Sequence, residues 1–158
     1  MASGSVSRLE VYEMQPLTAI LETILYARDL TAARAFYSDV LELDVYAEVK
    51  DRHIFFKLER QMLLIFNPDA TERPPASGAL PVPPHGTRGP GHVCFGATAK
   101  EIDQWRRRLE AANVGIEADF VWPAKSEALR GRSIYFRDPA GNSVEIAEPR
   151  IWGLPEEK

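Results

Sequence analysis

Residues 22–30, ETILYARDL, and residues 92–100, HVCFGATAK, share one pattern, an apolar strand that leads into the start of a helix. The second stretch begins 70 positions after the first. In both halves apolar residues then recur at three- and four-residue steps, as on one face of a helix. We predict one helix that begins after a cap at Asp29 or Thr31, and a second over residues 100–112. The apolar positions are Ala33, Phe36, Tyr37, Val40 and Leu41 in the first half, and Ile102, Trp105, Leu109 and Ala112 in the second.

Three further strand-like runs follow each predicted helix. RHIFF in the first half resembles RSIYF 80 positions later, and LLIFNP resembles VEIAEP 81 positions later. Because the extra positions fall in loops, the order of elements predicts an internal repeat of two βαβββ modules. We expect an α+β fold whose strands form an open, barrel-like mixed sheet around a cleft, with the helices outside. The predicted strands are 19–27, 45–49, 53–58 and 62–66 in the first half, and 92–95, 114–121, 133–137 and 143–147 in the second.

The segment 67–90, NPDATERPPASGALPVPPHGTRGP, separates the two modules and holds seven of the twelve prolines. Its composition predicts a long loop without helix or strand. The chain length of 158 residues favours a single domain. The predicted boundaries are an N-terminal arm at 1–17, the domain at 18–149 and a tail at 150–158, with module one at 18–68, the loop at 67–90 and module two at 91–149.

The composition is that of an ordinary globular protein, with 45% hydrophobic and 27% charged residues. A net charge of −4 argues against a nucleic-acid partner or an anionic membrane. No apolar run approaches the roughly 18 residues that a membrane span needs. Cys94 is the single cysteine, which fits a reducing compartment and excludes an internal disulfide. We therefore expect a soluble cytoplasmic protein.

Three ionisable residues, Glu22, His92 and Glu145, lie within otherwise apolar strands. The repeat places Glu22 and His92 at equivalent positions, and the counterpart of Glu145 is Leu64, or Leu63 if the register shifts by one. A charge buried alone is unfavourable, so each residue needs a partner, a proton or a cation. If the modules face each other across a shared cleft, one divalent metal would satisfy all three. An imidazole ligand favours Zn²⁺, Ni²⁺, Mn²⁺, Fe²⁺ or Co²⁺.

Each of these residues also has a purely structural interpretation. His92 would then be a hydrogen-bonded histidine at the start of a strand. Glu22 would be an exposed carboxylate at a strand edge, or would pair with Arg132 or Lys57. His85, in the proline-rich loop, would touch a substrate only if that loop folds over the cleft.

The last two strands offer similar alternatives. Glu145 would otherwise be a solvent-facing partner for Arg137 on the neighbouring strand. Tyr135 alternates to the same face as Ser133 and Arg137, so it is either a hydroxyl donor that lines the cleft or a core residue. Cys94 is predicted to be a small core residue.

The stretches LETILYARDLTAARAFYSDVLEL, GPGHVCF and YFRDPAGNSVEI resemble the vicinal oxygen chelate superfamily over about residues 18–149. That group includes glyoxalase I, extradiol dioxygenases, methylmalonyl-CoA epimerase, and the fosfomycin and bleomycin resistance proteins. By this resemblance Glu22, His92 and Glu145 fall on three metal-ligand positions. The resemblance also implies a small substrate that chelates the metal through two neighbouring oxygens, and a homodimer.

The ligand set bears on the reaction. Dioxygenases of the group use two histidines and one carboxylate on iron, whereas this set has one histidine and two glutamates. In glyoxalase I a fourth ligand, a glutamate that also serves as a base, stands where this chain has Leu63 or Leu64. An isomerase or lyase is therefore favoured, with Glu22, Glu145 and Tyr135 as the candidate catalytic residues. The alternative is a protein that binds a drug or another small molecule without chemistry.

Overall fold

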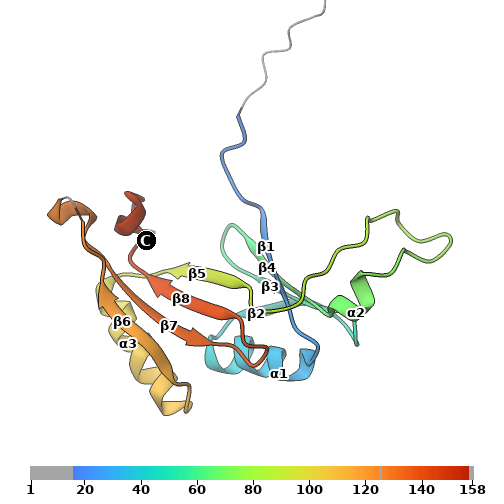
Figure 1. The fold of residues 1–158 in the computed structure, drawn as a ribbon, viewed down its shortest axis with the longest axis horizontal. Helices are drawn as coiled ribbons and strands as arrows, with labels where there is room; N and C mark the ends of the chain where they lie inside the picture. The colour runs from blue at the N-terminus through green and yellow to red at the C-terminus, as the bar shows by residue number, and fades with distance from the viewer. Residues whose placement is uncertain (1–15, 125, 157–158) are drawn as a thin grey trace, which may run out of the picture.

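Each half of the chain folds into a four-stranded mixed sheet with a helix, in the order that the repeat predicts (Figure 1). The computed structural model describes residues 16–124 and 126–156. The first module consists of β1 (Glu22–Tyr26), α1 (Leu30–Ala35), η1 (Phe36–Val40), β2 (Asp44–Val49), β3 (His53–Lys57) and β4 (Met62–Phe66). The second consists of β5 (His92–Gly96), α3 (Ala99–Ala111), β6 (Ile116–Val121), η2 (Glu127–Leu129), β7 (Arg132–Arg137) and β8 (Ser143–Ala147), followed by η3 (Pro149–Trp152).

The two sheets have the same topology. The strand orders are β1-β4-β3-β2 and β5-β8-β7-β6, and in each sheet the first strand lies parallel beside the last while the other pairs are antiparallel. Both sheets also contain a shift in the register of strand pairing at a similar place. The shift lies between Val45 and Ala47 in the first sheet and between Ile116 and Ala118 in the second. The predicted α+β fold of two βαβββ modules is confirmed, and both sheets are open.

The segment between the modules differs from its prediction. It begins with a short helix, α2 (Pro68–Thr71), so the expectation that 67–90 holds no helix was wrong. Asn67 caps this helix by accepting a hydrogen bond from the backbone N–H of Asp69, and proline suits the first turn. A helix of four residues is too short to produce a periodic apolar pattern. Further along the segment, the His85 N–H donates to the carbonyl of Thr71 at 3.0 Å.

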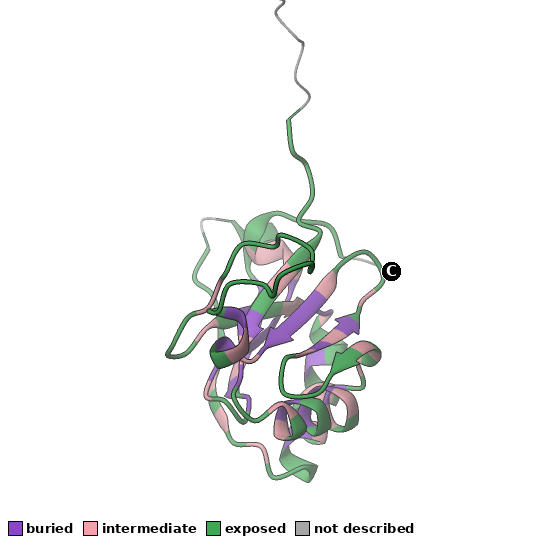
Figure 2. Cartoon of the chain, turned by 90° about the vertical axis from the view of Figure 1, so that its right-hand side faces the viewer, coloured by how far each residue is buried: buried purple, intermediate pink, exposed green. Residues whose placement is uncertain are grey.

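One hydrophobic core serves both modules. Ile54 and Phe56 on β3, like their counterparts Ile134 and Phe136 on β7, are completely buried. Burying a side chain of this size stabilises the fold by about 1.5–3 kcal/mol. Buried and less buried residues alternate along β3, whereas the central strands β4 and β8 each have four consecutive buried residues. Figure 2 shows the buried residues gathered on the strands, and in Figure 1 α1 and α3 lie in the lower part of the view. The other face of each sheet is not covered by α1 or α3, and we call it the open face.

A buried polar cluster joins the modules. Asn142 is 1% exposed, and its amide nitrogen donates to the carbonyl of Tyr26 at 3.2 Å and to Asp138 at 2.8 Å. Its side-chain oxygen accepts from the N–H of Gly91 at 2.7 Å. The hydroxyl of Tyr37 donates to Asp138 at 2.9 Å. The β7–β8 turn is thus bonded to the ends of the first strands of both modules.

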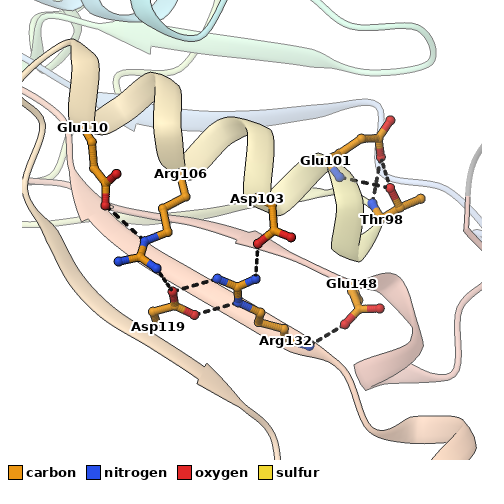
Figure 3. Close-up of polar contacts among 8 residues, drawn as sticks. All are labelled: Thr98, Glu101, Asp103, Arg106, Glu110, Asp119, Arg132 and Glu148. Carbon is orange, nitrogen blue, oxygen red and sulfur yellow. Dashed lines mark hydrogen bonds and ion pairs between the residues drawn. The ribbon is translucent and has the colours of Figure 1, made fainter.

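A second polar network, on the opposite side of the second sheet from its open face, fastens α3 to β6 and β7 (Figure 3). Arg132 donates to both carboxylate oxygens of Asp119, at 2.7 and 2.8 Å, and to Asp103 on α3 at 2.6 Å. Arg106 on α3 also lies 3.5 Å from Asp119. The fork-like contact with Arg132 holds the pKa of Asp119 below its ordinary value of 3.8.

Of the helices in the described ranges, none is long and apolar enough to cross a membrane.

Removing the hydrogen bonds of Asn142 and Asp138 that join the two modules is predicted to destabilise the whole domain. Asn142→Ala leaves the Gly91 N–H and the Tyr26 carbonyl without their partner, and we expect a loss of about 3 kcal/mol in the free energy of unfolding. Tyr37→Phe removes one hydrogen bond to Asp138 and should cost about 1.5 kcal/mol. Urea denaturation measures both. Tyr46→Phe, on a residue that is 67% exposed, is the control and should change nothing. Equal changes in the free energy of unfolding for Tyr37→Phe and Tyr46→Phe would show that the hydrogen bond between Tyr37 and Asp138 does not stabilise the domain.

The Asp119 carboxylate should make stability depend on pH in a defined direction. Because its pKa is lowered in the folded state, its contribution is present above pH 3.8 and is lost as the pH falls through the folded-state value. Asp119→Asn is expected to cost about 1.5 kcal/mol at pH 7 and progressively less below pH 3.8. Urea titrations from pH 7 to pH 3 measure the difference, with Glu59→Gln, at an exposed position away from this network, as a control. A difference that does not change with pH would show that the contribution is not electrostatic.

Candidate functional site

The open face of the second sheet brings His92 and Glu145 together. In the register of the sheet, Glu145 on β8 lies between Cys94 on β5 and Tyr135 on β7, so these side chains share one face. His92 Nε2 lies 3.3 Å from Glu145 Oε2, and His92 Nδ1 lies 3.1 Å from the carbonyl oxygen of Ser143. A carbonyl only accepts, so Nδ1 carries a hydrogen and donates to it. In the neutral imidazole, Nε2 then presents a lone pair to the carboxylate.

Two facing acceptors require a proton or a cation between them. The Glu145 side chain is only 7% exposed, and its Oε1 atom is buried without a hydrogen-bond partner among the described residues. Burying a carboxylate with one oxygen unsatisfied is unfavourable. The His92 side chain is 52% exposed, so the pair is open to solvent on one side. A histidine oriented through a carbonyl, beside a carboxylate with a free oxygen, is a donor pair that fits a divalent transition metal.

Tyr135 and Cys94 flank this pair. Desolvation, then hydrogen bonding with the Glu145 carboxylate and its charge, raise the pKa of the Tyr135 phenol to about 12. Desolvation, and then the charge of Glu145, raise the pKa of the Cys94 thiol to about 12. Tyr135 lines the open face, as one of its two interpretations predicts, and its ring stacks near that of His92 with centroids 6.3 Å apart. The prediction that Cys94 is a core residue was wrong, because it points to the open face and is exposed.

The structure places Glu22 elsewhere. It is exposed on β1 of the first sheet, in register with Met62 and, through Met62, with Lys57. Its proposed alternative partner Arg132 is bonded to Asp119 and Asp103 instead. In residues 16–124 and 126–156, no three His, Cys, Asp or Glu side chains are grouped so that they could hold a metal ion. One chain therefore assembles His92 and Glu145 and leaves Glu22 on the other sheet.

The register also resolves the structural alternatives for the last strands. Ile24 pairs with Leu64 as Cys94 pairs with Glu145, so Leu64 is the counterpart of Glu145 and is itself buried. Arg137 donates to Glu117 at 2.9 Å. The interpretation of Glu145 as a solvent-facing partner for Arg137 was therefore wrong.

An aromatic cluster on the open face of the first sheet was not recognised in the sequence. His53 stacks on Phe55 with ring centroids 4.1 Å apart, and burial, followed by the charge of Arg52, lowers its pKa. His85 accepts or donates a hydrogen bond with the Tyr26 hydroxyl at 2.7 Å. The short apolar runs HIFFK and MLLIF were the available signal for the strands, but the contact of His85 depends on the path of the loop.

The chain belongs to the Glyoxalase/Bleomycin resistance protein/Dioxygenase superfamily, whose sequence profile matches residues 19–146. Among solved structures, the chain is similar to a lactoylglutathione lyase from Agrobacterium tumefaciens, at 45% identity and a TM-score of 0.81. That match covers 89% of this chain and 100% of the other. None of the curated proteins compared with the chain matches it.

Two more distant similarities concern the fold alone. A virulence protein from Salmonella typhimurium is 23% identical, with a TM-score of 0.64, and the match covers 85% of this chain and 98% of the other. A glyoxalase/bleomycin resistance protein/dioxygenase from Nocardioides is 21% identical, with a TM-score of 0.63, and the match covers 92% and 93%.

The unsatisfied carboxylate should make the metal-free protein less stable than it could be. Replacing Glu145 by methionine removes a buried charge and keeps the length of the side chain, so we expect the free energy of unfolding to rise by about 1 kcal/mol. Urea denaturation in the presence of a chelator measures this. Glu22→Met makes the same change at an exposed position and should stay within about 0.5 kcal/mol of wild type. A destabilised Glu145→Met variant would show that the carboxylate is fully satisfied in the metal-free protein.

Proposed function

We propose that this protein is a metal-dependent lyase or isomerase that acts on a small substrate with two neighbouring oxygens. The observation that carries this proposal is the pairing of His92 Nε2 with the buried Glu145 carboxylate at 3.3 Å, with Glu145 Oε1 left unsatisfied within the described part of the chain. The 45% identity to the lactoylglutathione lyase from Agrobacterium tumefaciens supports the same class of reaction.

His92, Glu145 and Glu22 are the proposed ligands. Because Glu22 lies on the other sheet of the same chain, we propose a homodimer in which Glu22 of a second copy joins His92 and Glu145. Zinc, nickel, manganese, iron and cobalt are the candidate ions, since one imidazole and two carboxylates suit each of them. A cytoplasmic location is proposed on the ground that the single cysteine is a free thiol.

The residues of the proposed site have different roles in the reaction. The metal, when bound, acts as a Lewis acid that stabilises negative charge on the substrate oxygens. Glu145 is held rigidly by burial, whereas Glu22 is exposed and can change its position, so Glu22 is the better candidate to move a proton. The Tyr135 hydroxyl, on the same face, can donate a hydrogen bond to a substrate oxygen.

Leu64 restricts the choice of base. It occupies the position in the first module that Glu145 occupies in the second, and a leucine can neither ligate a metal nor accept a proton. Proton transfer therefore falls to Glu22 or Glu145. One histidine with two carboxylates also departs from the two-histidine, one-carboxylate set of iron oxygenases, which favours the lyase or isomerase.

Metal binding tests the proposed site directly. We expect the purified protein, stripped with chelator and then offered Zn²⁺, Ni²⁺, Mn²⁺, Co²⁺ or Fe²⁺, to bind one equivalent of at least one ion per chain, as measured by calorimetry and elemental analysis. His92→Ala and Glu145→Ala should each weaken binding at least 100-fold, and Glu22→Ala about tenfold, because Glu22 is exposed and is proposed to come from a second copy of the chain. Glu117→Ala, an exposed carboxylate change outside this site, should bind like wild type.

Activity is measured next as formation of S-lactoylglutathione from methylglyoxal and glutathione, with each metal in turn. Turnover that disappears in His92→Ala and Glu145→Ala supports the lyase. Unchanged metal binding in both variants would overturn the proposed site.

A non-catalytic binding protein is the second candidate. It is favoured by Leu64 in place of a carboxylate and by the aromatic cluster of His53, Phe55, Phe66 and His85 on the open face of the first sheet. A protein that binds small aromatic molecules with equal affinity before and after chelator treatment, and that takes up no metal, would support this candidate over the enzyme.

A further inference from the structure

Four rings form a row across the open face of the second sheet. The row starts at His92, whose ring centroid lies 6.3 Å from that of Tyr135 at an interplanar angle of 16°. The Tyr135 ring is parallel to that of Phe120 on β6, with centroids 5.9 Å apart. Phe120 then contacts Trp122 edge-on, with centroids 4.9 Å apart. The candidate metal pair is thus connected to the end of the sheet by a continuous aromatic surface.

The row ends in an apolar cleft of about 340 Å³. Trp122 forms one wall, and Leu129 and Trp152 face it from η2 and η3. Both are accessible, Leu129 at 41% and Trp152 at 77% of their surface. In Figure 1 the β6–β7 connection and the C-terminal turn lie at the same end of the second sheet. The volume lies at the lower end of the range for small-molecule sites. Pro123, Ala124 and Ile151 complete the lining.

The cleft is a fixed part of the fold. Gly131 lets η3 approach β7, because a Cβ atom there would lie 2.7 Å from the side chain of Ile151. The buried carboxylate of Glu148 accepts the backbone N–H of Arg132 at 2.8 Å, which holds the start of η3 against the sheet. The indole N–H of Trp122 donates to Ser133 at 2.8 Å and fixes the orientation of that ring. The segment 148–151, which includes the start of η3, is therefore held against the sheet.

The charges beside the cleft favour an uncharged occupant. Arg130 and Arg150 are the arginines that flank it, and each is paired with glutamate. Arg130 lies 3.6 Å from Glu127, and Arg150 lies 3.1 Å from Glu148 and 2.8 Å from Glu156. With these two arginines paired and the described walls made of indole and aliphatic side chains, the cleft suits an alkyl or aryl group.

We infer that the ligand of this site has two parts, a head with two neighbouring oxygens at His92 and Glu145 and an apolar tail that follows Tyr135 and Phe120 into the cleft between Trp122 and Trp152. The head rests on the proposed function, while the tail rests on the cleft and the ring row alone. The substrate class is therefore an oxygen-chelating compound with an alkyl or aryl substituent, rather than a small polar molecule.

Three probes separate the two parts. Acetohydroxamic acid and octanohydroxamic acid share a head with two neighbouring oxygens, and octanamide keeps the long tail without the second oxygen. The fluorescence of the cleft is isolated in a Trp105→Phe background, which leaves Trp122 and Trp152 as the only tryptophans. On zinc-loaded protein we expect octanohydroxamic acid to bind about 100-fold more tightly than acetohydroxamic acid, since six further methylene groups are at least partly buried.

Variants of the cleft wall then localise the tail. Trp152→Ala should reduce the preference for octanohydroxamic acid about tenfold and leave acetohydroxamic acid unchanged. Leu129→Asp, a second exposed position on the wall, should do the same. Leu80→Ala, an exposed apolar residue that is not among those lining the cleft, is the matched control. Equal affinity for both hydroxamic acids in the wild-type protein would overturn the tail site and leave the proposed function standing.

Octanamide distinguishes the failure of each part. One possible result is that octanamide quenches the fluorescence, that this quenching is lost in Trp152→Ala and does not change with chelator, and that the protein binds no metal. This result would support the tail site and would count against the proposed enzyme. If Trp122 and Trp152 are already shielded from acrylamide and do not respond to octanamide, a second copy of the chain occupies the cleft, and the inference is wrong.

Discussion

The arrangement of the two sheets depends on the buried pair of Asp138 and Asn142. Asn142 bonds to the carbonyl at the end of β1 and to the N–H just before β5, so one side chain fixes the first strand of each module. Gly91, whose N–H it binds, has no room for a side chain, because a Cβ atom would lie 2.8 Å from Leu25. His92 follows directly, so the joint that holds the modules together also positions the histidine of the candidate site.

The two modules share a backbone but differ in chemistry on their open faces. Where the second sheet has Cys94, Glu145 and Tyr135, the first has Ile24, Leu64 and Phe55 at the same register positions. The polar groups of the second face lie around one unsatisfied carboxylate, whereas the first face is mostly aromatic and aliphatic. A duplicated fold has thus kept its hydrophobic core in both halves, while the ionisable pair is present only in the second.

Stability and function oppose each other at Glu145. A buried carboxylate with an oxygen lacking a partner in the described structure is unfavourable in the metal-free protein. The surrounding strands tolerate it because β8 is central in its sheet and is paired on both sides. The aromatic row beside Glu145 extends the same open face toward the apolar cleft.

The sequence by itself determined the repeat, the order of the elements and the placement of Glu145 in the last strand of the second module, because apolar periodicity is a local property of the chain. It also predicted that Tyr135 could line the open face. The tertiary structure alone decided that Cys94 is exposed, that Glu22 lies apart from His92 and Glu145, and that η3 closes a cleft against Trp122. These features depend on contacts between residues distant in the chain, and their geometry follows from the register of the sheets and from joints such as Asn142.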